Sequence, residues 1–158
     1  MNINPTIVTD SREQTPLVFQ NLESQVGTLQ SGDYSILGFE DRFSVERKSL
    51  SDLCGSLTSG RERFERELHR LRGFDFARLL IIGTEEDVRS GNYRSKVNPK
   101  SVWASLCAFE VRYGVPFVFA PTPEAGAELV ERWAYWFARE QVRTFEKMRK
   151  AEKQKATP

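Results

Sequence analysis

The sequence predicts an α/β domain in which helices flank a mixed central sheet. Two observations lead to this fold class. Two β-rich runs in the first half of the chain flank a short turn, which is typical of an antiparallel hairpin. Apolar strands then alternate with amphipathic helices, which is typical of parallel crossovers. With 158 residues, the chain is long enough for one domain with a substantial core.

In the first half, one short strand is expected before the hairpin. A polar stretch that starts at Ser11 separates the two, and the hairpin turn begins at Gly38. Two helices are expected after the hairpin, and the second has apolar residues at i, i+4 and i+7 on one face. The expected strands cover residues 6–9, 33–37 and 43–48, and the expected helices cover residues 49–57 and 61–72.

In the second half, two strands and two helices are expected around a polar loop. Asn98 and Pro99 are a typical helix start, because Asn caps the first turn and Pro suits the first helical position. Gly114 is expected to end that helix, and Pro123 to begin the last one. The strands are expected at residues 78–82 and 116–120, and the loop at residues 85–97.

A single domain is predicted over residues 1–146, followed by a basic, disordered tail over residues 147–158, because the apolar period stops after about Phe145. No apolar run approaches the roughly 20 residues of a membrane helix, and the N-terminus lacks a signal-peptide pattern, so a cytoplasmic protein is expected. Cys54 and Cys107 have neither the spacing of a zinc site nor that of a disulfide framework.

The net charge is only +1, so an interpretation as a nucleic-acid-binding protein must rest on local clusters. One cluster of basic residues lies within residues 61–72, and a second within residues 139–155. Acidic residues dilute both, and charge-rich helix faces are more often simply solvated. The clusters support contact with nucleic acid without establishing it.

The hairpin brings two carboxylates and an ammonium group together. Glu46 and Lys48 share one face of a strand, because side chains at i and i+2 point the same way. If the turn centres near Glu40 and Asp41, Asp33 lies close to Lys48 on the neighbouring strand, about 4.8 Å away. Carboxylates suit Mg²⁺, which can activate water against a phosphodiester while a lysine adds positive charge.

A longer pattern surrounds these residues. Gly-Asp at 32–33 is followed by Glu-Arg-Lys at 46–48 and by Asp52, and an Asp-x-Arg-Glu pattern at residues 10–13 precedes them. In this order the residues closely resemble the nuclease domain of the XPF family of structure-specific endonucleases. The resemblance extends from about Ile7 to Phe137.

The resemblance implies a restriction-endonuclease-like fold of the PD-(D/E)xK type, with Mg²⁺- or Mn²⁺-dependent cleavage of DNA near junctions of duplex and single strand. No organic cofactor and no membrane are expected. Asp33 and Glu46 would bind the metal, Asp10 would complete the acidic site, Glu13 would lie beside it, and Lys48 would be the catalytic lysine. Arg47 would support the site or contact phosphate, and Asp52 would lie at the periphery of the site.

Several of these residues have structural alternatives. Ser49 and Asp52 also have the spacing of a capping box. Arg47 points away from Glu46 by simple alternation. Asp10 could be a turn residue, and Arg12 could pair with an acid rather than bind DNA.

Further DNA contacts are predicted at Arg61, which matches a family position, and at Arg94 and Lys96 in the polar loop. A solvated helix start and a mobile surface loop are the corresponding alternatives.

The chain departs from the family after Phe137, where no helix-hairpin-helix repeats follow. It therefore resembles a stand-alone nuclease domain of the bacterial or phage kind. A homodimer is expected, since Cys107, Val111 and Tyr135 are apolar residues that lie off the apolar stripes of their helices. It would restore binding to DNA by presenting two basic surfaces. Two other functions stay open: a catalytically inert DNA-binding module, and a nuclease with the same metal core that acts on other nucleic acids, including RNA.

Overall fold

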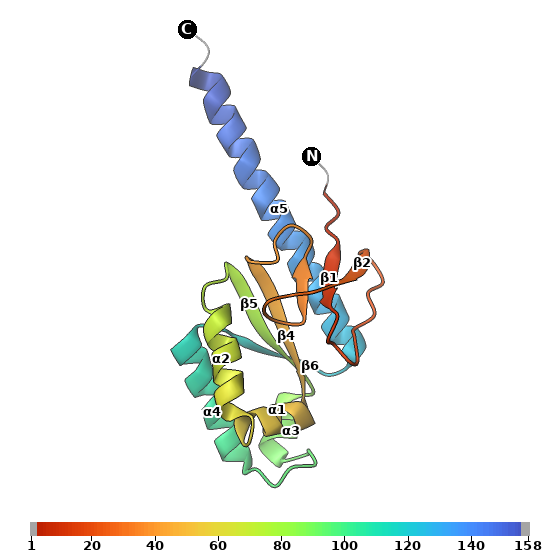
Figure 1. Ribbon diagram of the computed structural model, residues 1–158, viewed down its shortest axis with the longest axis vertical. Helices are drawn as coiled ribbons and strands as arrows, with labels where there is room; N and C mark the ends of the chain where they lie inside the picture. Colours follow the sequence, from red (N-terminus) through yellow and green to blue (C-terminus); the bar gives the residue numbers. More distant parts are fainter. Residues whose placement is uncertain (1–2, 156–158) are drawn as a thin grey trace.

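A six-stranded mixed sheet forms the centre of the computed structural model, which describes residues 3–155 (Figure 1). Its strands are β1 (Ile7–Asp10), β2 (Ser24–Gly27), β3 (Tyr34–Ile36), β4 (Phe43–Ser49), β5 (Phe76–Ile82) and β6 (Phe117–Ala120). Their order across the sheet is β2-β1-β3-β4-β5-β6. β3 is antiparallel to β1 and β4, while β2, β5 and β6 run parallel to their neighbours. The predicted hairpin and parallel crossovers are both present.

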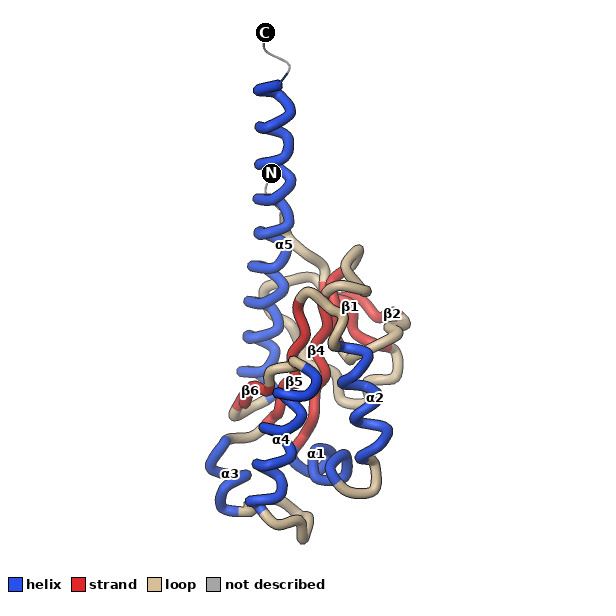
Figure 2. The backbone as a smooth tube through the Cα atoms, turned by 90° about the vertical axis from the view of Figure 1, so that its left-hand side faces the viewer, coloured by secondary structure: helices blue, strands red, loops and turns tan. Residues whose placement is uncertain are grey.

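Helices cover both faces of this sheet (Figures 1 and 2). They are α1 (Leu50–Leu57), α2 (Arg61–Leu71), α3 (Glu85–Ser90), α4 (Pro99–Tyr113) and α5 (Pro123–Lys155). The core between α1, α2, α4 and the sheet includes Phe64, Leu106 and Ile81. The core on the opposite face includes Tyr34 and Val45, which pack with residues of α5. The predicted α/β class with flanking helices is therefore confirmed.

The long helix α5 extends well beyond the sheet, as Figure 1 shows. Its N-terminal half is buried against the sheet at Val130 and Ala134, whereas Phe145 and Met148 are exposed. Residues 147–155, expected to belong to a disordered tail, instead continue helix α5 to Lys155. Residues 156–158 of the expected tail lie outside the described range. Trp136 is 62% exposed, on the outer side of α5.

Two elements were missing from the sequence-based expectation. β2 lies in the stretch predicted to be irregular and forms the exposed edge of the sheet, paired with β1. α3 occupies the first part of the predicted polar loop. Thr84 and Asp87 form a reciprocal capping box at its start, which stabilises this short helix. No helix among residues 3–155 is long and apolar enough to cross a membrane.

Glu131 of α5 ties the last helix to the first loop of the chain. It is 5% exposed, and its carboxylate accepts hydrogen bonds from the backbone N–H groups of Gln20, Asn21 and Leu22 at 2.6–2.9 Å. The side-chain amide of Asn21 also donates to it at 2.8 Å. This buried carboxylate therefore holds the segment between β1 and β2 against α5.

Candidate active site

Three acidic residues lie next to one another across β1, β3 and β4. Thr9 pairs with Tyr34, and Tyr34 pairs with Val45. The adjoining residues Asp10, Asp33 and Glu46 therefore form a row across the three strands, and the backbone N–H of Asp10 donates to the carbonyl of Asp33 at 2.8 Å. Residues directly opposite in antiparallel strands share a face, so this row crosses one side of the sheet.

The register of the hairpin differs from the predicted one by two residues. Tyr34 pairs with Val45, which places Asp33 beside Glu46 and not beside Lys48 as expected, because the turn centres between Phe39 and Glu40 and not between Glu40 and Asp41. The turn contains two successive bends: the Ile36 carbonyl accepts a hydrogen bond from the backbone N–H of Phe39, and the Phe39 carbonyl accepts from those of Arg42 and Phe43.

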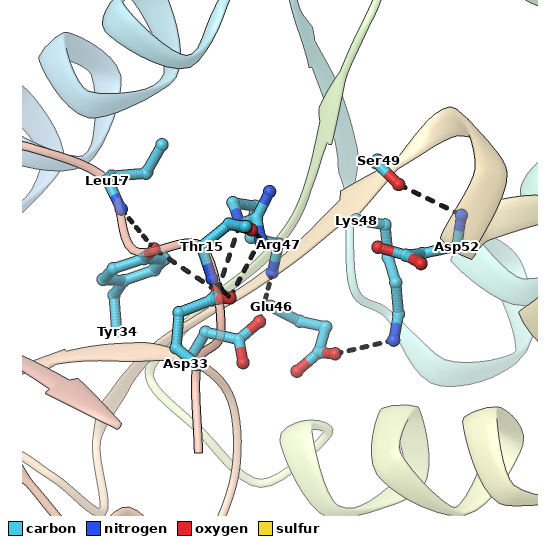
Figure 3. A network of polar contacts seen from close by, with 10 residues as sticks. Thr15, Leu17, Asp33, Tyr34, Glu46, Arg47, Lys48, Ser49 and Asp52 are labelled. Atoms are coloured by element: carbon cyan, nitrogen blue, oxygen red, sulfur yellow. Dashed lines mark hydrogen bonds and ion pairs between the residues drawn. The ribbon is translucent and has the colours of Figure 1, made fainter. Parts of the chain in front are cut away.

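Asp33 and Glu46 hold two carboxyl groups in a poorly solvated place. Glu46 is 8% exposed and Asp33 is half-buried. Figure 3 shows the two side chains beside each other. Burial raises the pKa of both groups, and for Glu46 the negative charge of Asp33 raises it further. A backbone hydrogen bond from Arg47 to Asp33 Oδ2, at 2.8 Å, opposes the rise at Asp33 without cancelling it.

Lys48 completes the arrangement. Its Nζ lies 3.0 Å from Glu46 Oε1, and Figure 3 shows the two side chains pointing toward each other. The same Nζ lies 3.8 Å from Glu67 Oε2 on α2 and 5.2 Å from the centre of the Phe64 ring. Burial alone would lower the pKa of Lys48, but the charge of Glu46 outweighs it, and the pKa is raised. The ammonium group is therefore held charged beside the carboxylates.

Asp10 is turned toward a different partner. Its Oδ2 accepts a 2.8 Å hydrogen bond from Arg12 Nε, and its Oδ1 accepts one of 3.0 Å from the backbone of Leu29. Burial raises the pKa of Asp10, but the Arg12 and Leu29 hydrogen bonds outweigh it, and the net pKa is lowered. Arg12 also donates to the Leu29 carbonyl at 2.6 Å. Arg12 was predicted either to bind DNA or to pair with an acid, and in this structure it forms an ion pair with Asp10.

Glu13 and Arg47 form a buried pair on the opposite face of the sheet from Glu46. Arg47 Nε and Nη2 donate to the two carboxylate oxygens of Glu13 at 3.1 and 2.9 Å, and their side chains are 11% and 7% exposed. Burial raises the pKa of Glu13, but the Arg47 hydrogen bond outweighs it and lowers the pKa. Arg47 thus braces the segment after β1, in keeping with the structural alternative for this residue.

The backbone conformation and close packing at position 32 require a glycine before Asp33. The φ of Gly32 is +76°, a region that residues with a side chain rarely adopt. A Cβ at this position would also collide with Ser44 Oγ on β4. The glycine therefore allows the close approach of the two strands that sets Asp33 beside Glu46.

Asp52 lies in the first turn of α1, where Ser49 is the N-cap. The Ser49 hydroxyl accepts a 3.1 Å hydrogen bond from the backbone N–H of Asp52 (Figure 3). Asp52 is exposed. Its position fits the helix-cap alternative, and Ser49 carries the cap directly after the strand that bears Lys48.

The predicted DNA-contacting residues are not gathered at the site. Arg61 donates to Ser105 Oγ at 3.1 Å and lies over the Phe109 ring at 4.7 Å, so it joins α2 to α4. Arg94 and Lys96 are exposed in the loop between α3 and α4. Residue-by-residue reasoning also missed Glu67. Only its place on α2, opposite the end of β4, brings it to Lys48, and no local motif marks it.

The donor set fits a divalent cation at Asp33 and Glu46. Two carboxylates with raised pKa values and little solvent are an arrangement that a cation stabilises. Asp10 could join them only by releasing Arg12. Among residues 3–155, no group of three or more Asp, Glu, His or Cys side chains is arranged to hold a metal ion. The arrangement therefore supports two protein ligands and leaves other positions to water or substrate.

Comparison with known proteins identifies the domain. Residues 8–132 match the ERCC4 domain. The chain is 29% identical over 141 residues to the DNA repair endonuclease XPF of Cricetulus griseus, a match that covers 80% of this chain and 15% of that protein. Two structures of XPF from Aeropyrum pernix are also similar, one of them a complex with DNA.

The two structural matches, each at 24% identity, have TM-scores of 0.66 and, for the DNA complex, 0.68. They cover 82% and 86% of this chain but 60% and 66% of the archaeal chains. The chain thus spans less than two thirds of these relatives. The likeness confirms the restriction-endonuclease-like fold, and the domain match confirms the resemblance seen in the sequence. The chain belongs to the ERCC4 domain family, with the nuclease-domain fold of XPF.

Proposed function

We propose that this protein is a metal-dependent DNA endonuclease that hydrolyses phosphodiester bonds, at branched DNA such as flaps and forks. The observation that carries the proposal is the facing pair Asp33 and Glu46 with Lys48 at 3.0 Å from Glu46. Membership of the ERCC4 domain family supports it. The hamster relative is named a DNA repair endonuclease, and one archaeal relative was solved with DNA, which favours DNA as the substrate.

In the proposed mechanism, Asp33 and Glu46 hold Mg²⁺, or Mn²⁺ as a substitute. The ion supplies Lewis acidity for attack of water on phosphorus and offsets charge on the phosphate. Arg47 positions Asp33 through its backbone N–H, at 2.8 Å from Oδ2. Lys48 places a positive charge where the phosphate becomes more negative. When Glu46 binds the metal, Glu67 still faces the Lys48 ammonium, at 3.8 Å.

The proposal extends to a homodimer that acts on intracellular DNA. Val111 on α4 is 87% exposed, and Cys107 on the same helix is exposed, so an apolar area is available to a second copy. Sedimentation at several protein concentrations checks the dimer. Val111→Glu is expected to shift the protein toward the monomer, with Val26→Glu, at a similarly exposed valine on β2, as the control. A wild-type protein that stays monomeric throughout contradicts the dimer.

The experiment that tests the activity is a cleavage panel. Linear duplex, flap, fork and four-way-junction DNA and a matched RNA are incubated with wild type, with Mg²⁺ or with EDTA. Asp33→Asn is expected to abolish cleavage. Asp41→Asn is the matched control, because Asp41 lies exposed in the turn of the same hairpin. Cleavage that survives both Asp33→Asn and EDTA contradicts the proposed site, and cleavage confined to RNA contradicts the proposed substrate.

A further inference from the structure

α2 carries a row of three exposed arginines without ion-pair partners. Arg63, Arg66 and Arg70 recur at i, i+3 and i+7, so they lie along one face of the helix. None of them lies within 4.0 Å of a carboxylate in the part of the chain that the structure describes. Other exposed arginines, such as Arg89 and Arg132, are paired with a glutamate on their own helix.

Two of the three acids of α2 face elsewhere, and the third, Glu62, is exposed and lies more than 4.0 Å from every arginine among residues 3–155. Glu65 accepts hydrogen bonds from Arg112 at 2.5 Å and from Tyr113 at 2.9 Å, both on α4. Glu67 faces Lys48 on β4. One flank of α2 therefore meets α4, the other flank meets the proposed active site, and the arginines stay unneutralised.

Arg63 and Arg70 lie on the flank of α2 that carries Glu67, while Arg66 lies further out, where it lines a shallow depression with Arg70 and His69. Phe64 and Leu68 mark the buried side of the helix. Glu67 is next to that side, toward Lys48, and Arg63 and Arg70 are its neighbours on the helix surface at i−4 and i+3. Arg61, by contrast, is directed toward Ser105 of α4. A strand that passes Glu46 and Lys48 would next meet Arg63 and Arg70, with Arg66 on their outer side.

We propose that Arg63, Arg66 and Arg70 bind consecutive backbone phosphates of the DNA strand that enters the active site. This inference rests on the proposed function and names its substrate-binding surface. At a rise of 1.5 Å per residue the row is about 10.5 Å long, which corresponds to roughly three nucleotides at 3.4 Å each. Guanidinium groups bind phosphate through paired N–H donors, and unpaired ones need not first release a carboxylate.

DNA binding in EDTA tests this surface without cleavage. The affinity of a fluorescein-labelled fork is measured by anisotropy over a series of KCl concentrations for wild type and for Arg63→Gln/Arg70→Gln. Each lost phosphate contact lowers the slope of log Kd against log salt by about one, so the double variant is expected to lose about two. Arg66→Gln alone is expected to lose about one. Because Arg66→Gln changes one exposed side chain, this variant tests the surface even if the double variant fails to fold.

The matched control is Arg89→Gln/Arg132→Gln, which removes the same charge from two exposed arginines that are already ion-paired. It is expected to keep the wild-type slope. Equal slopes for the two double variants, whether lowered or unchanged, overturn the inference while wild type still binds and cuts DNA. A wild type that neither binds nor cuts DNA overturns the proposed function as well, so the two failures can be told apart.

Discussion

Asp33 faces Glu46 across neighbouring strands, and burial raises the pKa of both carboxyl groups. Without a cation, this arrangement costs folding free energy, because two negative charges repel each other in a poorly solvated place. The sheet therefore maintains an unfavourable pair whose relief is the binding of a positive ion. Its effect on stability can be measured without any assay of cleavage.

Asp33→Asn should make the metal-free protein more stable at pH 8, by about 1 kcal/mol. The amide oxygen can still accept from the Arg47 N–H, while the repulsion with Glu46 is gone. Because the pKa of Asp33 is raised on folding, the stability of metal-free wild type should also fall as pH rises above the ordinary value of 3.8. Urea unfolding in EDTA measures both effects. A variant that is less stable than wild type in EDTA would contradict this account.

Mg²⁺ should raise the melting temperature of wild type and leave that of Asp33→Asn unchanged. A ligand that binds only the folded state stabilises it in proportion to its affinity, and the variant has lost one of two ligands. Differential scanning fluorimetry across a Mg²⁺ titration measures the shift. Asp41→Asn should behave like wild type, since its exposed carboxylate lies outside the site.

Arg47→Ala and Glu13→Ala should each destabilise the protein by about 3 kcal/mol, because each leaves the other charge buried without its partner. The double variant should cost much less than the two single costs combined. A double-mutant cycle by urea unfolding gives the coupling free energy, which we expect to exceed about 1 kcal/mol. The exposed pair Arg89–Glu85 is the control, with a coupling below about 0.5 kcal/mol. Additive costs at Arg47 and Glu13 would argue against the pair.

Glu131→Gln should destabilise the protein by about 2 kcal/mol at pH 7, because the carboxylate accepts four hydrogen bonds from residues 20–22. Burial raises the pKa of Glu131, but these hydrogen bonds outweigh it and lower the pKa. The stability that the carboxylate contributes is therefore present above 4.5 and is lost as pH falls below that value. Urea unfolding at pH 7 and pH 3.5 should show the gap to wild type closing. Glu128→Gln, one turn away and exposed, should have little effect at either pH.

Gly32→Ala should cost about 2 kcal/mol or more and should lower cleavage. The new Cβ meets Ser44 Oγ in addition to the strain of a positive φ. Gly38→Ala separates the two effects, because Gly38 has a φ of +86° and no atom within 4 Å of the added Cβ. Its cost should be about 1 kcal/mol. Equal costs at the two glycines would show that the contact with Ser44 has no energetic weight.

The sequence predicted the elements that a strong local pattern marks. Asn98 and Gly114 bound α4 as expected, since a side-chain cap and a left-handed glycine end are local devices. β2 was missed because its four residues have no apolar alternation, and they become a strand only by pairing with β1. α3 was missed although Thr84 and Asp87 have capping-box spacing, because its polar residues have little apolar period.

The contacts among the candidate site residues could be predicted only in part. Spacing predicted that Glu46 and Lys48 share a face, and their ion pair confirms it. The partner of Asp33 depended on the position of the turn, which holds two successive hydrogen-bonded bends and no marked turn motif. The contact of Glu67 with Lys48 joins two elements whose relative placement no local pattern records.

The packing of α5 has a consequence for biosynthesis. The strands that bear Asp10, Asp33 and Glu46 rest on α5 through Tyr34 and Val45, and Glu131 secures the loop after β1. A ribosome makes this helix after all six strands, so a nascent chain lacks the support beneath its acidic residues until α5 has been synthesised. We expect a polypeptide stopped after Thr122 to remain unfolded by circular dichroism, so that the row of carboxylates would form only once α5 is present.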